Sequence, residues 1–188
     1  MYEAIVIGAS AGGMETIGKL LKLLDGGFKL PIVIVQHLSP SSDDYIINYF
    51  NRLGEIKVKE ADEKEKLQGG VVYIAPPNYH LLIEKDKTLS LTVEPRVSYA
   101  RPSIDVLFDS AAEVFRDKLI GIVLTGANSD GSNGLKKIKE FGGLTIVEDP
   151  STAKVEAMPR FALDKVKADY VLRVEDIASK IAELSGGV

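Results

Sequence analysis

Short runs of apolar, mostly β-branched residues alternate along the chain with stretches in which apolar residues recur at helical spacing. The first unit pairs an apolar run at 4–7 with a helix whose apolar face includes Ile17, Leu20 and Leu24. Nearly continuous apolar strands are typical of a parallel sheet that helices cover on both faces. The opening pattern therefore predicts a strand, helix, strand repeat.

The same reasoning predicts the remaining elements. Further strands are expected at 31–35, 71–75, 119–124, 144–147 and 170–172, and helices at 46–53, 104–115, around 135–138, and at 155–166 and 176–184. Residues 80–94 instead predict an antiparallel hairpin that reverses near Asp86, and 96–101 a surface loop. Ser103 is the predicted N-cap of the helix after that loop. We predict an α/β fold over 1–188: a single doubly wound, mostly parallel sheet with helices on both faces and an antiparallel hairpin insertion.

Composition narrows the class of protein. The 188 residues fit one domain, and 45% hydrophobic with 27% charged residues is ordinary for a packed water-soluble protein. The net charge is -4 and no basic cluster stands out, which argues against a nucleic-acid partner. The absence of cysteine excludes thiolate metal sites, disulfides and cysteine nucleophiles.

The sequence predicts neither a targeting signal nor a membrane-spanning segment. The apolar run at 4–7 is too short for a signal peptide and lacks a basic flank. No run approaches the roughly 20 apolar residues of a membrane span. We therefore expect a cytoplasmic protein without membrane insertion.

A glycine-rich turn, Gly8-Ala9-Ser10-Ala11-Gly12-Gly13, joins the first predicted strand to its helix. It matches G-x-S-x-G, in which a sharp strand-to-helix turn exposes a serine nucleophile. Amides at the helix start, that of Ala11 among them, are candidate donors to an oxyanion. A phosphate-binding turn of a nucleotide domain and a plain structural turn stay open as alternatives.

Two other polar residues follow neighbouring predicted strands. His37 ends the second strand, and adjacent strand ends lie roughly 5 to 10 Å apart, so its imidazole can reach Ser10 as a base. Asp130 lies in the loop after strand 119–124 and is a candidate to orient His37, although an ordinary helix N-cap is the alternative. His80 opens the hairpin and is expected to pack there. The order Ser, His, Asp differs from that of α/β-hydrolases, which indicates a convergent triad.

Several motifs in order carry a resemblance to a known family. They are Gly8–Gly13, Val35-Gln36-His37, Tyr73-Ile74-Ala75-Pro76, Arg101–Phe108, Leu124-Thr125-Gly126 with Asp130-Gly131, and Ala157-Met158-Pro159. Together they resemble the catalytic domain of CheB, the chemotaxis protein-glutamate methylesterases. The resemblance implies a cytoplasmic serine esterase that hydrolyses γ-glutamyl methyl esters on chemoreceptor helices, with glutamine deamidation as a related activity. It also implies a catalytic triad of Ser10, His37 and Asp130.

The chain departs from the family pattern in three places. It begins at the first catalytic strand, so we expect a stand-alone form without a receiver domain, with any receiver or signalling partner acting in trans. Ala127 and Asn128 stand where the family commonly has Met-Gly, and Ser98-Tyr99-Ala100 where it often has Asn-Arg-His. The substrate is therefore expected to be a methylated chemoreceptor or another methyl-esterified protein. The candidates for the oxyanion and substrate side are Ala11, Gly12, Gly126 and Ala127.

The expected reaction is acyl transfer through Ser10 with neither a cofactor nor a metal ion. Two other classes of function stay open from the sequence. One is a nucleotide- or phosphate-binding module that uses the Gly8–Gly13 turn, and the other is a catalytically idle signalling adaptor.

Overall fold

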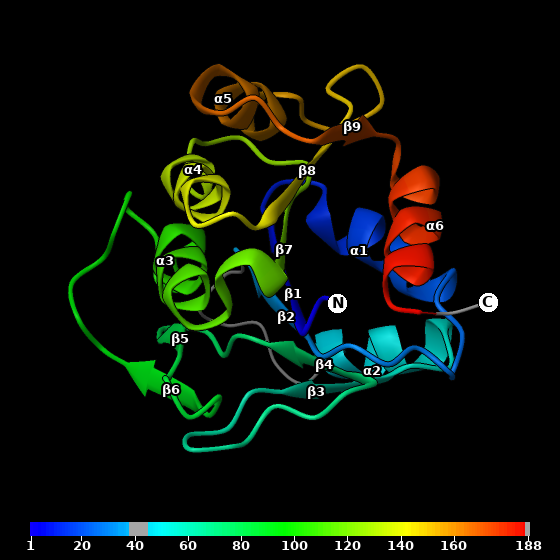
Figure 1. The fold of residues 1–188 in the computed structure, drawn as a ribbon, viewed down its shortest axis with the longest axis vertical. Coiled ribbons are helices and arrows are strands. Elements are labelled where there is room, and N and C mark those ends of the chain that lie inside the picture. The colour runs from blue at the N-terminus through cyan, green and yellow to red at the C-terminus, as the bar shows by residue number, and fades with distance from the viewer. Residues whose placement is uncertain (38–44, 187–188) are drawn as a thin grey trace.

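The computed structural model describes residues 1–37 and 45–186. Its centre is a seven-stranded sheet of order β3-β4-β2-β1-β7-β8-β9, in which every pair of neighbours is parallel (Figure 1). The strands are β1 (Ala4–Ala9), β2 (Ile32–Gln36), β3 (Lys57–Glu60), β4 (Val71–Ile74), β7 (Leu119–Val123), β8 (Leu144–Glu148) and β9 (Tyr170–Leu172). The predicted fold class is confirmed.

Helices cover both faces of this sheet, as Figure 1 shows. One layer is α1 (Gly13–Lys22), α2 (Tyr45–Leu53) and α6 (Val174–Leu184); the other is α3 (Ile104–Phe115) with the short 3-10 turn η1 (Arg116–Lys118), α4 (Ser132–Glu140) and α5 (Ala157–Lys165). Successive β1 residues point to opposite faces, so Val6 packs under α3 while Ile5 and Ile7 pack under α1. Two apolar cores result, one on each face of the sheet.

The predicted hairpin forms a small sheet of its own. Strands β5 (His80–Ile83) and β6 (Leu89–Thr92) pair antiparallel and pack against α3. Leu81, Ile83 and Leu89 are buried in the same core as the inner face of α3. The insertion thereby extends the layer that holds α3 in place.

Strand β3 was not predicted, because only Val58 of its four residues is apolar and buried. It is an edge strand, and Lys59 forms ion pairs with Asp62 and Glu65. Two helix boundaries also differ slightly: α5 begins at Ala157 and α6 begins at Val174. Among the described residues, no helix combines the length and the apolar character needed to cross a membrane.

The position of β1 determines where a site can form. It lies between β2 and β7, with Ala9 opposite Gln36 and Gly8 opposite Val123. The chain first builds the sheet outward from β1 in one direction and then returns to place β7 on its other side. This reversal is a topological switch point, where open α/β sheets bind ligands beyond the carboxyl ends of their strands.

Candidate active site

Ser10 follows β1 in a tight turn that leads into α1. Its N–H donates to the Thr125 carbonyl at 2.9 Å, and its carbonyl accepts the Gly13 N–H at 2.8 Å. Gly12 has φ +81°, and a Cβ there would lie 2.7 Å from Cβ of Lys154, so the turn requires glycine. These constraints fix the Ser10 side chain at the carboxyl edge of the sheet.

His37 connects Ser10 to Asp130. Its Nδ1 lies 3.2 Å from Oγ of Ser10, and its Nε2 lies 2.8 Å from Oδ2 of Asp130. Because a carboxylate only accepts hydrogen bonds, Nε2 carries the ring proton and Nδ1 is left as the acceptor that faces Ser10. The structure thus brings the three predicted residues together in one hydrogen-bonded chain.

Asp130 is fully buried and accepts four hydrogen bonds. Oδ2 accepts from Nε2 of His37 and from the Ile104 N–H (2.7 Å), and Oδ1 accepts from Oγ of Ser103 (2.8 Å) and the Asp105 N–H (3.0 Å). Burial raises the pKa of this carboxyl, but the hydrogen bonds from His37, Asp105 and Ile104 outweigh burial and hold the pKa below its usual value. Asp130 is therefore held as a carboxylate.

The same contacts show how the N-terminus of α3 is capped. Ser103 occupies the N-cap position, yet its side chain makes no capping bond and donates to Asp130 instead. The first amides of α3 are satisfied by the carboxylate of Asp130, which comes from the loop after β7. A negative charge at a helix N-terminus is favourable, so α3 helps to stabilise the charged form of Asp130.

Gln36, the last residue of β2, is a site residue that was not predicted from the sequence. Its Nε2 donates to the carbonyls of Ser10 and His37, both at 2.9 Å. Gln36 is buried, and a Cβ at position 13 would lie 1.8 Å from its Oε1. One amide thus links the backbone at the candidate nucleophile to the backbone at the candidate base.

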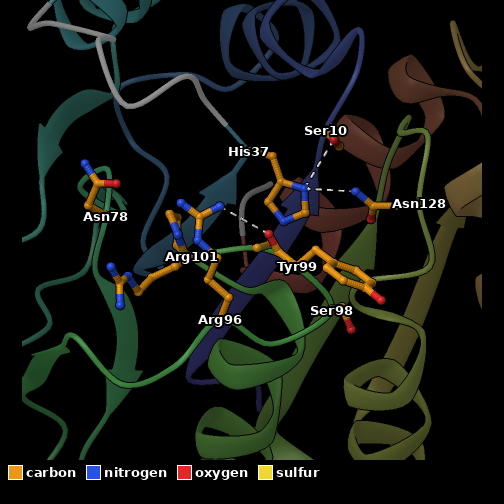
Figure 2. A pocket seen from close by; sticks show the side chains of 10 residues that line it. Ser10, His37, Asn78, Arg96, Ser98, Tyr99, Arg101 and Asn128 are labelled. Carbon is orange, nitrogen blue, oxygen red and sulfur yellow. Dashed lines mark hydrogen bonds between the residues drawn. The ribbon is translucent and has the colours of Figure 1, made fainter.

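A cavity of about 360 Å³ opens beside Ser10 and His37. Figure 2 shows Asn128 reaching the same ring nitrogen of His37 as Ser10, with Arg96, Arg101 and Tyr99 along the cavity. Neither Arg96 nor Arg101 has an acidic side chain among the described residues that line the cavity. The wall is therefore positively charged.

The four residues predicted for the oxyanion and substrate side lie outside the lining of the cavity beside Ser10 and His37. Ala11 and Gly12 are exposed in the turn after Ser10. Gly126 does not suit an oxyanion donor, because its N–H already donates to the Val155 carbonyl at 3.1 Å. Ala127 is exposed, and within the described part of the chain none of the four lines the cavity.

His80 is buried away from this chemistry, as expected. Its Nδ1 accepts the Ser103 N–H at 3.2 Å, and its Nε2 lies 3.0 Å from the Pro95 carbonyl, which makes it a bridge between the hairpin and the start of α3. Over residues 1–37 and 45–186, no group of three or more His, Cys, Asp or Glu side chains is placed to hold a metal ion.

Fold and site together define a class: a doubly wound α/β protein whose switch point carries a linked serine, histidine and aspartate. Comparison with known proteins identifies the family. The family model described as CheB methylesterase matches residues 5–181. The chain therefore belongs to the CheB methylesterase family, and with it to the hydrolases, so the resemblance found in the sequence is confirmed.

Individual relatives support the same family assignment. A Leptospira interrogans protein named "Putative protein-glutamate methylesterase/protein-glutamine glutaminase" is 56% identical over 97% of this chain and 95% of its own length. The protein-glutamate methylesterase/protein-glutamine glutaminase of Clostridium acetobutylicum is 36% identical over 99% of this chain, which spans 54% of that protein. The crystal structure of the Thermotoga maritima CheB methylesterase catalytic domain superposes with a TM-score of 0.93 at 35% identity, covering 98% of this chain and 99% of that one.

Proposed function

We propose that this protein hydrolyses γ-glutamyl methyl esters of chemoreceptors or of another methyl-esterified protein, with Ser10 as nucleophile, His37 as general base and Asp130 as its orienting acid. The observation that carries the proposal is the hydrogen bonding of one imidazole to both Ser10 and a buried carboxylate. A serine hydroxyl needs such a base to become a nucleophile near neutral pH.

In the first half-reaction, Oγ of Ser10 attacks the ester carbonyl carbon while its proton passes to Nδ1 of His37. The carbonyl electron pair moves onto oxygen, and Asp130 stabilises the imidazolium through Nε2. When the carbonyl re-forms, the bond to methoxide breaks and His37 gives its proton to the leaving oxygen, so that methanol departs. A glutamyl ester of Ser10 remains.

In the second half-reaction, water attacks that ester and gives a proton to His37. Collapse of the second tetrahedral intermediate releases the glutamate carboxyl group and returns the proton to Ser10. A glutamine side chain can follow the same route, with ammonia as the leaving group, which is the basis for a related deamidase activity. The described side chains suffice for each proton transfer.

The charge of the cavity supports a substrate rich in carboxylates. Arg96 and Arg101 line it together with the exposed ring of Tyr99. Positive side chains beside a reacting glutamyl ester favour segments in which neighbouring glutamates are unesterified. We propose that a helix of the substrate protein, with unesterified glutamates beside the methyl-esterified one, lies along the cavity.

The nucleotide-binding alternative is less well supported by the turn. A phosphate site requires free amides at the start of the helix. Here two amides of the turn, those of Ser10 and Gly13, are already used by the carbonyls of Thr125 and Ser10, which leaves fewer of them for a phosphate. The Ser10 hydroxyl faces His37, which is the direction that acyl transfer needs.

The test is methanol release from methyl-esterified chemoreceptor membranes by wild type, Ser10→Ala and the control Ser129→Ala, which removes an exposed hydroxyl near Asp130. We expect release by wild type and Ser129→Ala, and none above background with Ser10→Ala at unchanged thermal stability. Equal release by all three proteins would reject Ser10 as the nucleophile. No release by any of them would reject this substrate.

A further inference from the structure

The side chain of Asn128 is placed at the reacting centre, although the triad does not require it. It lies half-buried in the loop between β7 and α4 and lines the cavity with Ser10 and His37 (Figure 2). Its Nδ2 is 3.3 Å from Nδ1 of His37, the ring nitrogen that Oγ of Ser10 approaches at 3.2 Å. The Ser10 hydroxyl and the Asn128 NH₂ group are therefore both placed to donate to the lone pair of Nδ1 of His37.

The orientation of this amide is fixed from the other side. The backbone N–H of Asp130 donates to Oδ1 of Asn128 at 3.1 Å. Because a backbone N–H can only donate, the oxygen must face Asp130 and the NH₂ group must face His37 and Ser10. Asn128 is thus a donor aimed into the cavity beside Ser10 and His37.

Proton transfer removes the acceptor that Asn128 has in the free protein. Once Nδ1 of His37 takes the Ser10 proton, it becomes a donor, and two N–H groups face each other. The strongest acceptor then close to Asn128 is the carbonyl oxygen that has just gained negative charge, since its carbon is bonded to Oγ of Ser10. A donor aimed at a developing oxyanion lowers the barrier to acyl transfer.

We propose that Asn128 is a further catalytic residue, whose Nδ2 donates to the oxyanion of the tetrahedral intermediate. This proposal rests on the proposed esterase function and deepens it. It names a side-chain donor in the loop between β7 and α4, where the N–H of Gly126 is not free to serve. The Gly126 N–H is used within the fold, so a side chain supplies the charge stabilisation from the β7 side.

The test compares Asn128→Ala and Asn128→Asp with wild type and with Asn48→Ala, which changes an exposed asparagine on α2. Asn128→Asp keeps an acceptor for the Asp130 N–H but replaces the donor with an acceptor. We expect kcat for methanol release to fall about 10²- to 10³-fold in both Asn128 variants, with KM changed less than about threefold. For Asn128→Ala the fall should be equal at every pH, and Asn48→Ala should match wild type.

If the wild type releases methanol, either of two results would overturn the inference. Unchanged kcat in Asn128→Ala would show that no donor was lost. A displaced acid limb of the pH profile with an unchanged plateau would show that Asn128 only tunes His37. If wild type releases no methanol, the proposed substrate fails, and Asn128 is judged by Ser10-dependent hydrolysis of p-nitrophenyl acetate under the same criteria. Absence of that hydrolysis too would overturn both.

Discussion

At the scale of single residues, the site depends on a carboxylate with two structural tasks. Asp130 holds the ring of His37 and also satisfies the first two amides of α3. Each carboxylate oxygen of Asp130 accepts one backbone N–H of α3. A side chain that placed an NH₂ group at either oxygen position would leave that backbone N–H without an acceptor. The geometry of the candidate triad and the capping of α3 therefore both depend on this one side chain.

Asp130→Asn should destabilise the fold by about 1–3 kcal/mol at pH 7, because either orientation of the new amide sets its NH₂ group against a backbone N–H. The folded-state pKa of Asp130 is lowered. The contribution of Asp130 to the free energy of unfolding is therefore fully present above its unfolded-state pKa of about 4. It is lost as the pH falls through the lower pKa that Asp130 has in the folded protein. Urea unfolding from pH 7 to pH 3 should show the wild-type advantage shrinking with acid.

The control for this experiment is Asp164→Asn, an exposed carboxyl on α5. Its effect should stay within about 0.5 kcal/mol at all pH values. A wild-type advantage over Asp130→Asn that is the same at pH 3 as at pH 7 would mean that the charge of Asp130 does not stabilise the fold.

The sequence predicts part of this site for a clear reason. Ser10 and His37 directly follow strands that are read as apolar runs, and parallel strands bring their carboxyl ends together. Gln36 and Asn128 act through contacts with residues 26 and 91 positions away, respectively. No local pattern encodes such contacts, although a polar residue ending a buried strand, as Gln36 does, is a usable signal.

At the scale of elements, the site depends on close packing between β1, α3 and the loop after β7. Ile104, the first residue of α3, fills the space beside two glycines. A Cβ at Gly8 would lie 2.3 Å from Cγ2 of Ile104, and a Cβ at Gly131 would lie 2.7 Å from the same atom. Ile104 therefore sets how near Asp130 comes to the end of β1.

Gly8→Ala should destabilise the protein by about 1–3 kcal/mol, because the new methyl group overlaps Ile104. Ile104→Ala alone should cost about 2–5 kcal/mol through the cavity it leaves. The double variant should cost at least about 1 kcal/mol less than the sum, since the removed side chain makes room for the added methyl group. Chemical denaturation of the four proteins measures this coupling.

Gly27→Ala provides the matched comparison, because Gly27 is exposed and its nearest neighbour is the side chain of Asp25 at 3.3 Å. Combined with Ile104→Ala it should show additive effects. Additive effects for Gly8→Ala and Ile104→Ala as well would contradict the packing that relates α3 to β1.

Strand prediction succeeded wherever the strand reads as an apolar run, which includes the exposed edge strand β9, and it failed for β3, which does not. The interior strands β1, β2 and β7 are buried throughout and read as apolar runs. Edge strand β3 has a single buried apolar residue, Val58, and is defined by its pairing with β4 rather than by its own sequence. Pairing of this kind is a tertiary effect that periodicity does not reveal.

At the scale of the whole molecule, the topology assembles the site. Ser10, His37 and Asp130 come from loops after β1, β2 and β7, three adjacent strands at the reversal of the sheet order. The two apolar cores hold these strand ends in register, so the hydrogen-bonded chain needs little ordering when substrate arrives. The central claim is that the three residues act as one catalytic unit.

The most direct test of this claim is a double-variant comparison of methanol release by Ser10→Ala, His37→Gln and the two combined. Residues that act as a unit lose activity together, so each single change should cost about 10⁴- to 10⁶-fold in kcat, and the double variant should lose no more than the worse single one. Losses that multiply in the double variant, or a single variant within about threefold of wild type, would contradict a joint role for Ser10 and His37.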